Sequence, residues 1–586
     1  MRLSITKTKS AHRLYAIKST YDPATQKNSS KIVAKFGTAE ELMEEKHMSY
    51  DEVILWVKEE IARMDAASDA EKEKSISIAL NPEKRLEKGC RRFVHTGYLF
   101  PKKILSELGV KKICDKISEK ENFKYDLGEI LETLVCGRII EPRSKRATAT
   151  WAKSLVEAPS FKEHQIYRAL SVLAAHSDEI QASLYKASSK LTKRKDGVLY
   201  YDCTNFFFEI NNEDIDGGLR QYGVSKEHRP NPIVQMGLFT DAQGIPLAFR
   251  MAPGNTNEQV TMRPLEQTII SDFEHAKFVV CTDSGLASCD NKMFNTKGGR
   301  AFICVQSIKK MPGYLKEWAL DSTGWRMHNS KKTYNLNELA ETAYMNDIFY
   351  KERWVPGKKG EADQRYIATF SFKYKEYLAE IRESQIERAC ARVNQGASSL
   401  ERKRETDPMR LVDVAHITKD GEVCDKVVAS INEKKIREEQ RFDGFSCLVT
   451  TLEDNASDII AVNKMRWQIE ECFRIMKTEF KARPVYLNKD ERIEAHFLCC
   501  FIALLVFRLL EKRLNMKDVT CEDILRTLRK MNMLELKGEG WMPCFEPNEI
   551  TDVLHSKFGF CTDYEIVTYR RMRTILAKSK SPKITI

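Results

Sequence analysis

The sequence predicts a mixed α/β protein whose core is interrupted by a strand-rich insertion. Three observations support this prediction. From about residue 196 apolar strands alternate with helices, as expected of an α/β core. This pattern stops near 311 and resumes with GFSCLVTTL at 444–452. The residues from 100 to 195 read almost entirely as helix. A chain of 586 residues has room for about three to five domains.

The first region, 1–75, is predicted to contain a β-hairpin, a helix and a linker. Two strand-like stretches, LYAIKSTY and SKIVAKFGT, flank the polar DPATQKNS, which indicates a hairpin. A helix is expected over about 51–64, because apolar residues recur there at helical spacing. The following AASDAEKEKSIS has the polar composition of a linker.

The second region, 76–195, is predicted to be helical and to bind DNA. The stretches PKKILSELGVKKICDKI and YDLGEILETLVCGRII are both amphipathic. The basic EPRSKRATATW, with Arg143, Lys145 and Arg146, follows the second of them. Helices with a basic turn can dock on DNA, and equally they can be ordinary packing units.

The core is predicted in two parts, 196–310 and 441–515, separated by the insertion 311–440. Its first part holds the apolar strand VLYYDCTNFFFEI, a hairpin of IVQMGLFT and IPLAFRM around DAQG, and the strands AKFVVCTDSG and AFICVQSI. The insertion contains the alternating RYIATFSF and a long charged helix. After the core resumes, a helix is expected from about Ser457 to Phe480.

The C-terminal region, 516–586, is predicted to be helical with a basic tail. Just before it, FLCCFIALLVF (497–507) is too short to span a bilayer and is expected to be a buried helix. The N-terminus has no apolar run after its charges, so no signal peptide is predicted. The 16 cysteines include no C-x-x-C pair, which favours free thiols in a reducing cytosol. We therefore expect a soluble, intracellular protein.

Two aspartates occupy unusual positions in the predicted strands. Asp202 lies inside an apolar strand, where a carboxylate is costly unless a cation compensates it. Asp283 lies at the C-terminal end of another strand, the edge at which α/β sheets place ligands. Neither has a Lys or Arg close by in sequence, so a bound cation is one explanation. The alternative for each is a turn former or a cap.

A third acid stands among cations on the predicted helix NKMRWQIEECFRIMKTEF. At about 100° per residue, one compact stripe is apolar and consists of Ile469, Phe473, Met476 and Phe480. The stripe beside it is polar and consists of Asn463, Arg466, Glu470, Arg474 and Lys477. A solvated helix face, stabilised by an Arg466–Glu470 pair, would give the same pattern.

These residues resemble a known family. The chain is similar to DDE transposases of bacterial insertion sequences, in the insertion-sequence-four-like branch with a Tyr-x2-Arg-x3-Glu-x6-Lys signature. Arg466, Glu470 and Lys477 match its last three positions, whereas Asn463 stands where the signature has Tyr. The strands with YYDCTN and CTDSG resemble those that carry the two aspartates. The segments ARPVYL, YGVSKEHRPN, QMGLF and PGN resemble the same branch, and the similarity covers about 198–510.

The resemblance implies a ribonuclease H-like core in which Asp202, Asp283 and Glu470 form a catalytic, metal-binding triad. Hard oxygen ligands suit Mg²⁺, with Mn²⁺ as a substitute, and two ions would serve an in-line displacement at phosphorus. Arg466, Arg474 and Lys477 would bind DNA. Asn463 would bind it too, since an amide can still hydrogen-bond a phosphate oxygen, so we expect an active enzyme with reduced rate.

The implied function is DNA transposition, with cleavage at terminal inverted repeats followed by strand transfer. The partners would be double-stranded DNA of the transposon ends and of the target, held by a homodimer. The bacterial cytoplasm would be its location, at the nucleoid when DNA is bound. The net charge of +11 suits a polyanion, although solvated surface charge is the simpler explanation. A metal-dependent nuclease without strand transfer, and a non-catalytic DNA-binding descendant, are the alternatives.

The insertion is a second candidate for DNA contact. It contains Trp318, Trp325 and Trp354 in a basic stretch. In related transposases the insertion can stack an aromatic residue on a base flipped near the transposon end, and an exposed Trp would serve; core packing is the alternative for each of the three.

Overall fold

In the computed structural model, contacts divide the chain into two compact units, Met1–Cys90 with Leu536–Gly540, and Arg91–Glu535 with Trp541–Ile586. The residues that the structure describes are 1–8, 11–22, 27–72, 76, 78, 81–83, 85–328, 330–357, 361–395, 407–416 and 427–584.

The first unit is a three-stranded antiparallel sheet covered by two helices. In the region of the predicted hairpin, β2 (His12–Asp22) pairs with β3 (Lys27–Thr38), and β1 (Arg2–Lys7) lies beside β2 as a further strand. Helix α1 (Ala39–Lys46) begins at a Thr38 capping box. Helix α2 (Tyr50–Lys72) continues into the stretch AASDAEKEKSIS that was predicted to be a linker. The linker prediction was therefore wrong for the first residues of that stretch, which are helical.

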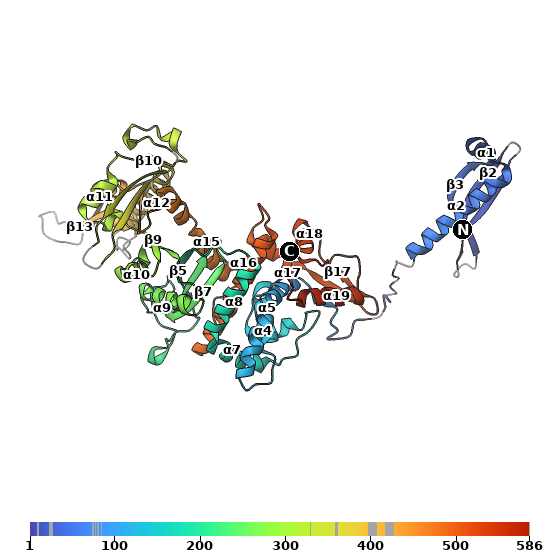
Figure 1. The fold of residues 1–586 in the computed structure, drawn as a ribbon, viewed down its shortest axis with the longest axis horizontal. Helices are drawn as coiled ribbons and strands as arrows, with labels where there is room; N and C mark the ends of the chain where they lie inside the picture. Colours follow the sequence, from blue (N-terminus) through green and yellow to red (C-terminus); the bar gives the residue numbers. More distant parts are fainter. Residues whose placement is uncertain are drawn as a thin grey trace. The chain divides into compact units, whose positions relative to one another are not determined.

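The second unit opens with the predicted helical region (Figure 1). Its elements are β4 (Phe93–His95), α3 (Leu99–Glu107), α4 (Val110–Lys120), α5 (Leu127–Ile140), α6 (Lys145–Ala152), α7 (Glu163–Ala175) and α8 (Ser177–Leu191). The predicted basic segment forms the start of α6, whose N-cap is Ser144. Helix α5 has apolar residues all round and is almost fully buried.

The predicted core strands are confirmed as one side of a nine-stranded mixed sheet. These are β5 (Val198–Phe207), β6 (Ile233–Asp241), β7 (Pro246–Pro253), β8 (Val279–Thr282) and β9 (Ala301–Val305). They lie in the order β7-β6-β5-β8-β9. The three on the β7 side run antiparallel to one another, whereas β5, β8 and β9 are parallel. Helix α9 (Glu258–Ser271) follows β7, and α10 (Cys289–Phe294) follows β8.

The predicted insertion does not interrupt this sheet but extends it. Three of its strands continue the same sheet through β15 in the order β10-β11-β12-β15-β9. Their bounds are β10 (Arg326–Met327), β11 (Phe349–Val355), β12 (Gln364–Phe370) and β15 (Phe445–Thr450). The rest of the segment holds α11 (Gly313–Leu320), α12 (Phe372–Asn394), α13 (Glu433–Gln440) and the hairpin of β13 (Val412–His416) and β14 (Val427–Ile431).

The helix predicted over 457–480 is broken into pieces. Helix α14 (Ala456–Lys464) has Met465 as its C-cap, and α15 (Trp467–Arg474) begins after Arg466. A π-helical turn, Ile475–Glu479, follows α15 directly. The four residues of the predicted apolar stripe, Ile469, Phe473, Met476 and Phe480, are all buried in one cluster. The break and the wider π turn change the direction of the polar side chains beside it.

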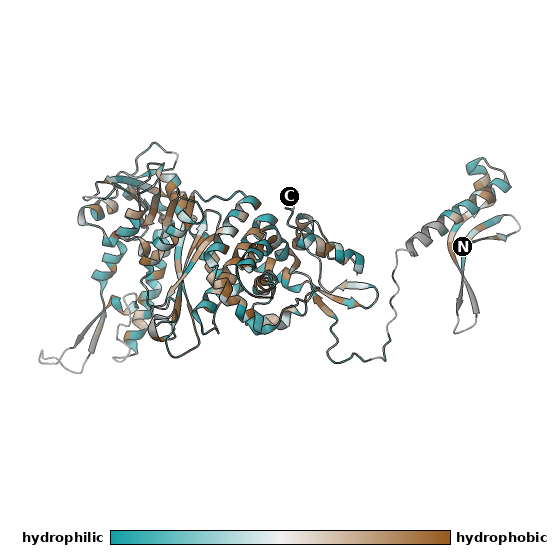
Figure 2. Ribbon diagram, turned by 60° about the horizontal axis from the view of Figure 1, so that its bottom comes forward, coloured by the Kyte–Doolittle hydropathy of each residue, from teal (hydrophilic) through white to brown (hydrophobic). Residues whose placement is uncertain are grey.

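The long apolar helix α16 (Asp490–Leu514) forms the centre of the second unit, as predicted for 497–507. It is long and apolar enough to cross a membrane by composition, yet 89% of its apolar window is buried inside the protein. It packs on α3, α5 and α7 and on β7. Figure 2 shows hydrophobic residues, in brown, gathered inside the helical part of this unit.

The C-terminal region contains strands that the sequence did not predict. Helices α17 (Cys521–Lys530), α18 (Glu549–Phe558) and α19 (Tyr569–Lys580) alternate with β16 (Asn532–Leu536), β17 (Gly540–Pro543) and β18 (Val567–Thr568). These strands form a four-stranded sheet with β4 in the order β18-β17-β16-β4. The last helix, α19, carries the predicted basic tail and packs on α3.

Candidate active site

The alternation of β5 decides which way Asp202 points. Leu199, Tyr201 and Cys203 belong to the hydrophobic cluster that packs on α9. Tyr200 and Phe206 belong to the cluster on the opposite face, which includes residues of α15 and α16. Because side chains alternate along a strand, Asp202 lies on the face covered by α15.

Asp283 lies beside Asp202 on this face. Strands β5 and β8 are parallel, and Tyr200 is in register with Cys281. Two residues further along, the same register places Asp202 opposite Asp283, just past the end of β8. Cys281 belongs to the same cluster as Tyr200, so Asp283 shares its face. The sequence-predicted pair of aspartates therefore meets on one face of the sheet, with Asp202 in the middle of β5 and Asp283 just past the end of β8.

The two carboxylates differ in their surroundings. Burial raises the pKa of Asp202 to about 6, although Lys226, the backbone N–H of Cys203 and Arg466 oppose that shift, and Asp283 adds to it. The Cys203 N–H donates to Asp202 Oδ1 at 2.8 Å. The Asp283 side chain is half exposed, and its Oδ1 accepts the N–H of Ser284. Asp202 is thus a carboxylate that the protein compensates only in part.

Three cations surround the aspartates. Arg466 lies 3.9 Å from Asp283 and is largely buried. Lys226 donates to the carbonyl of Cys203 and lies 3.1 Å from Glu258. Burial lowers the pKa of Lys226, but Asp202 and Glu258 outweigh it, so the pKa is raised and the charge is held.

The third cation, Lys477, comes from the π-helical turn. Burial and the neighbouring Lys226 lower its pKa to about 8, with Asp202 acting in the opposite direction. Its ammonium lies over the ring of Phe206 and 3.5 Å from Glu227. The predicted Arg466 and Lys477 are therefore both brought to the aspartates.

The other predicted residues lie differently. Glu470 is exposed, one turn after Arg466 on α15, so it lies on the same side of that helix. Arg474 forms a two-pronged pair with Glu471 and interacts with groups near α17, away from the aspartates. Asn463 is half-buried on α14, where its Oδ1 accepts from the thiol of Cys281 at 3.8 Å. The helix break thus turns Asn463 toward β8 rather than along the expected polar stripe.

The donor set of the aspartate pair fits a divalent cation. Asp202 is a half-buried carboxylate with partial compensation, and Asp283 offers oxygen from the adjacent strand. Carboxylate oxygens are the ligands that Mg²⁺ and Mn²⁺ prefer. Among the described residues, Asp202, Asp283 and Glu470 do not form a group with all ligand atoms within 4.8 Å of one another. Glu470 would therefore have to move inward to complete a set of three ligands.

Sequence reasoning missed the residues that the loop before β6 brings to the site. Lys226 contacts the strand of Asp202, and Glu227 pairs with both Lys477 and Arg483. Glu258, at the start of α9, holds Lys226. The only signal was the segment YGVSKEHRPN, which resembles the family without assigning a role to any residue in it.

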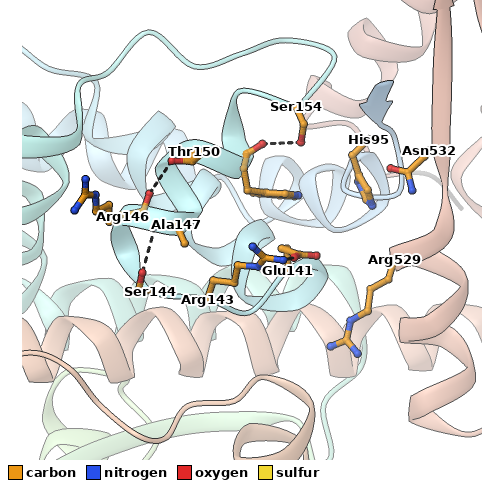
Figure 3. A pocket seen from close by; sticks show the side chains of 11 residues that line it. His95, Glu141, Arg143, Ser144, Arg146, Ala147, Thr150, Ser154, Arg529 and Asn532 are labelled. Atoms are coloured by element: carbon orange, nitrogen blue, oxygen red, sulfur yellow. Dashed lines mark hydrogen bonds and ion pairs between the residues drawn. The ribbon is translucent and has the colours of Figure 1, made fainter. Parts of the chain in front are cut away.

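The basic segment of the helical region has one buried and two exposed basic residues. Lys145 is buried, and its Nζ lies 3.3 Å from His496 of α16, so it cannot contact DNA as predicted. Arg143 and Arg146 are exposed and line an open cavity of about 550 Å³, which Figure 3 shows. Arg529 of α17 lines the same cavity, and Glu141 is its one acidic lining residue. This cavity is a basic surface separate from the aspartates.

The three tryptophans of the insertion also differ. Trp325 is fully buried and Trp318 is packed against the same cluster, so core packing explains both. Trp354, on β11, is 45% exposed.

The segment that supplies Arg466, Glu470 and Lys477 is similar to known transposases. Residues 371–506 match the family model described as the transposase DDE domain. That segment contains Arg466, Glu470 and Lys477, whereas both aspartates precede it. No curated protein matches the chain. A cryo-EM structure of the piggyBac transposase synaptic complex with hairpin DNA is 9% identical, with a TM-score of 0.34, over 82% of this chain and 84% of that one.

Proposed function

We propose that this protein is a DDE transposase that cleaves DNA at terminal inverted repeats and joins the freed ends to target DNA. One observation carries the proposal. Asp202 in β5 and Asp283 just past the end of the parallel β8 lie side by side, next to Arg466 and Lys477 from the segment that matches the transposase DDE domain. In phosphoryl transfer, carboxylates can hold the metal ions and basic side chains can bind the phosphate, and this group of residues offers both.

The sheet topology supports a ribonuclease H-like core. Among the five strands β7-β6-β5-β8-β9, β5 with the first aspartate is the middle one, with two strands in antiparallel pairing on one side and two parallel strands on the other. We assign Asp202, Asp283 and Glu470 as ligands of two Mg²⁺ ions, for which Mn²⁺ can substitute. The metal, when bound, would activate the attacking oxygen and neutralise charge on the leaving oxygen.

The residues of the chain have distinct roles in this proposal. Arg466 holds Asp283 and reduces the repulsion between the two aspartates, since it lowers the pKa of Asp202. Lys477, with its pKa near 8, is charged at neutral pH and can bind a DNA phosphate beside the acids. Lys226 and Glu258 position the strand of Asp202 through the Cys203 carbonyl. Asn463 supports β8 at Cys281.

DNA recognition is assigned to surfaces outside the acid pair. The cavity with Arg143 and Arg146 offers phosphate contacts in the helical region, and the exposed Trp354 offers an aromatic surface in the insertion. A homodimer would hold two transposon ends together, in the bacterial cytoplasm.

The function is tested with a labelled duplex that carries the inverted repeats flanking the gene, incubated with a target plasmid. The expected products are strand breaks at the repeat ends and covalently joined plasmid, both dependent on Mg²⁺ or Mn²⁺. Breaks without joined product would identify a nuclease that does not transfer strands. Binding without breaks in either metal would contradict the catalytic proposal.

We expect the double variant Arg143→Ala/Arg146→Ala to bind repeat DNA about tenfold more weakly and with a shallower salt dependence. Each phosphate contact contributes about 0.9 to the slope of log affinity against log salt, so the slope should fall by about two. Electrophoretic shifts at several salt concentrations measure both quantities.

The matched control for this variant is Lys111→Ala/Lys120→Ala. These lysines are also exposed in the helical region, and each is paired with an acid, as Arg143 and Arg146 are. Equal losses of DNA affinity in the two double variants would show that the cavity contributes only general electrostatic attraction. The cavity would then not be part of the recognition surface.

A further inference from the structure

A cluster of three different metal-ligating groups lies far along the chain from the aspartates. His555 is in the last turn of α18, and Cys561 and Asp563 follow in the loop that folds back over it. One ligand atom from each of the three lies within 4.8 Å of the other two. Of the described residues, this is the one group of three or more His, Cys, Asp or Glu that meets this distance.

The distance between His555 and Asp563 is informative. His555 Nδ1 and Asp563 Oδ2 are 3.4 Å apart, longer than a good N–H···O hydrogen bond. Two ligands on a tetrahedral zinc ion, with Zn–N and Zn–O bonds of about 2.0–2.2 Å, are separated by about 3.4 Å. The two atoms therefore stand at the spacing of ligands that share an ion.

The second ring nitrogen of His555 is held by Thr562. Nε2 lies 3.0 Å from Thr562 Oγ1 and accepts the backbone N–H of Thr562 at 3.2 Å. A neutral ring that accepts at Nε2 carries its proton on Nδ1, toward Asp563. A metal ion that binds Nδ1 would replace this proton.

The surroundings shield the His555 side of the cluster from solvent. His555 and Thr562 are buried, and the rings of Phe100, Phe558 and Phe560 pack against one another beside the imidazole. Cys561 contributes the thiolate that zinc prefers over harder cations.

We propose that His555, Cys561 and Asp563 bind one Zn²⁺ ion, with water as the fourth ligand, and that this ion fixes the loop between α18 and α19. The loop leads through β18 into α19, which carries Arg570, Arg571 and Arg573 and packs on α3. Zinc would thus hold the basic C-terminal helix on the helical region. This site is separate from the aspartates and does not depend on the proposed function.

The test is Zn²⁺ binding by the full chain, measured by competition with a chromophoric chelator after metal removal. We expect one tight equivalent, and Cys561→Ser should weaken it more than about a hundredfold, since even outer-shell changes cost about 10–100-fold. Co²⁺ in place of Zn²⁺ should give a thiolate charge-transfer band that is absent from Cys561→Ser. Zinc should also raise the unfolding temperature of the unchanged protein and not that of the variant.

Two controls make the result decisive. Cys544→Ser removes an exposed thiol of the same region and should bind zinc as the unchanged protein does. Asp202→Asn should also keep the tight equivalent, which separates this site from the aspartate pair. Absence of a tight equivalent, or the same affinity in Cys561→Ser, would overturn the proposal.

Discussion

Replacing Asp202 with Asn should lower Mg²⁺-dependent strand cleavage at least about a thousandfold. Losing a metal-ligating carboxylate removes several kcal/mol of transition-state stabilisation, and about 4 kcal/mol corresponds to a thousandfold in rate. Asn keeps the size of the side chain and an oxygen that can accept the Cys203 N–H. Single-turnover cleavage of a repeat duplex measures the rate, and electrophoretic shifts without divalent metal should show unchanged DNA binding.

The same variant should not lose stability, which separates a catalytic role from a structural one. Burial raises the pKa of Asp202 to about 6, above its value in the unfolded chain. The ionised form is therefore disfavoured in the folded protein. Ionisation of Asp202 lowers the free energy of unfolding above about pH 6, and this loss disappears as the pH falls. Without metal at pH 7.5, Asp202→Asn should unfold at the same or a higher temperature.

The control for this prediction is Asp290→Asn. Asp290 is an exposed acid on α10, paired with Arg263 at 3.3 Å. Its variant should cleave at nearly the unchanged rate. Cleavage near that rate in Asp202→Asn would remove Asp202 from the site, and a large loss of stability would assign it a structural role.

Replacing Arg194 with Met should destabilise the second unit by about 3–5 kcal/mol. Arg194 and Asp241 form a fully buried ion pair, with Nε 2.9 Å from Oδ2. The guanidinium also donates to Ser188 and to the carbonyls of Ile245 and Pro246. Asp241 ends β6, so removing Arg194 leaves a buried carboxylate without its cation at the turn into β7.

Urea unfolding followed by circular dichroism measures this effect, and the transition of the second unit should shift to lower urea. Arg437→Met is the matched control, because Arg437 forms an exposed pair with Glu433 on α13 that contributes little. Strand β6 pairs with β5, which carries Asp202, from Leu199 to Phe207. The loss of stability at the end of β6 should therefore also weaken DNA cleavage. An unchanged transition would show that the backbone N–H groups of Gln243 and Ile245 alone satisfy Asp241.

Local patterns predicted most of the individual elements. The hairpin of β2 and β3, the helical region, the apolar β5 and the buried α16 each follow from periodicity within one segment. The pairings between distant segments did not follow. Periodicity identifies a strand but not its neighbour, so β15 between β9 and β12 and the sheet of β4 with β16 were missed.

The site was predicted where its residues lie in regular elements. The family resemblance implied that Asp202 and Asp283 lie together, and the register of β5 and β8 brings the two residues side by side. Asn463 and Arg474 were placed on one stripe because a regular helix was assumed. A break at Met465 and a π-helical turn depend on tertiary packing, which no local pattern contains. Lys226 lies in a loop, where periodicity gives no direction.

The continuity of the nine-stranded sheet has a consequence for truncation of this chain. Strand β15 is hydrogen-bonded to β9 on one side and to β12 on the other. Excising residues 311–440 would leave β15 with a row of unpaired N–H and C=O groups along its full length. Such an exposed edge is a template for intermolecular pairing, so the shortened chain would be prone to aggregate. The segment therefore protects the edge of the sheet, in addition to any role in contacting DNA.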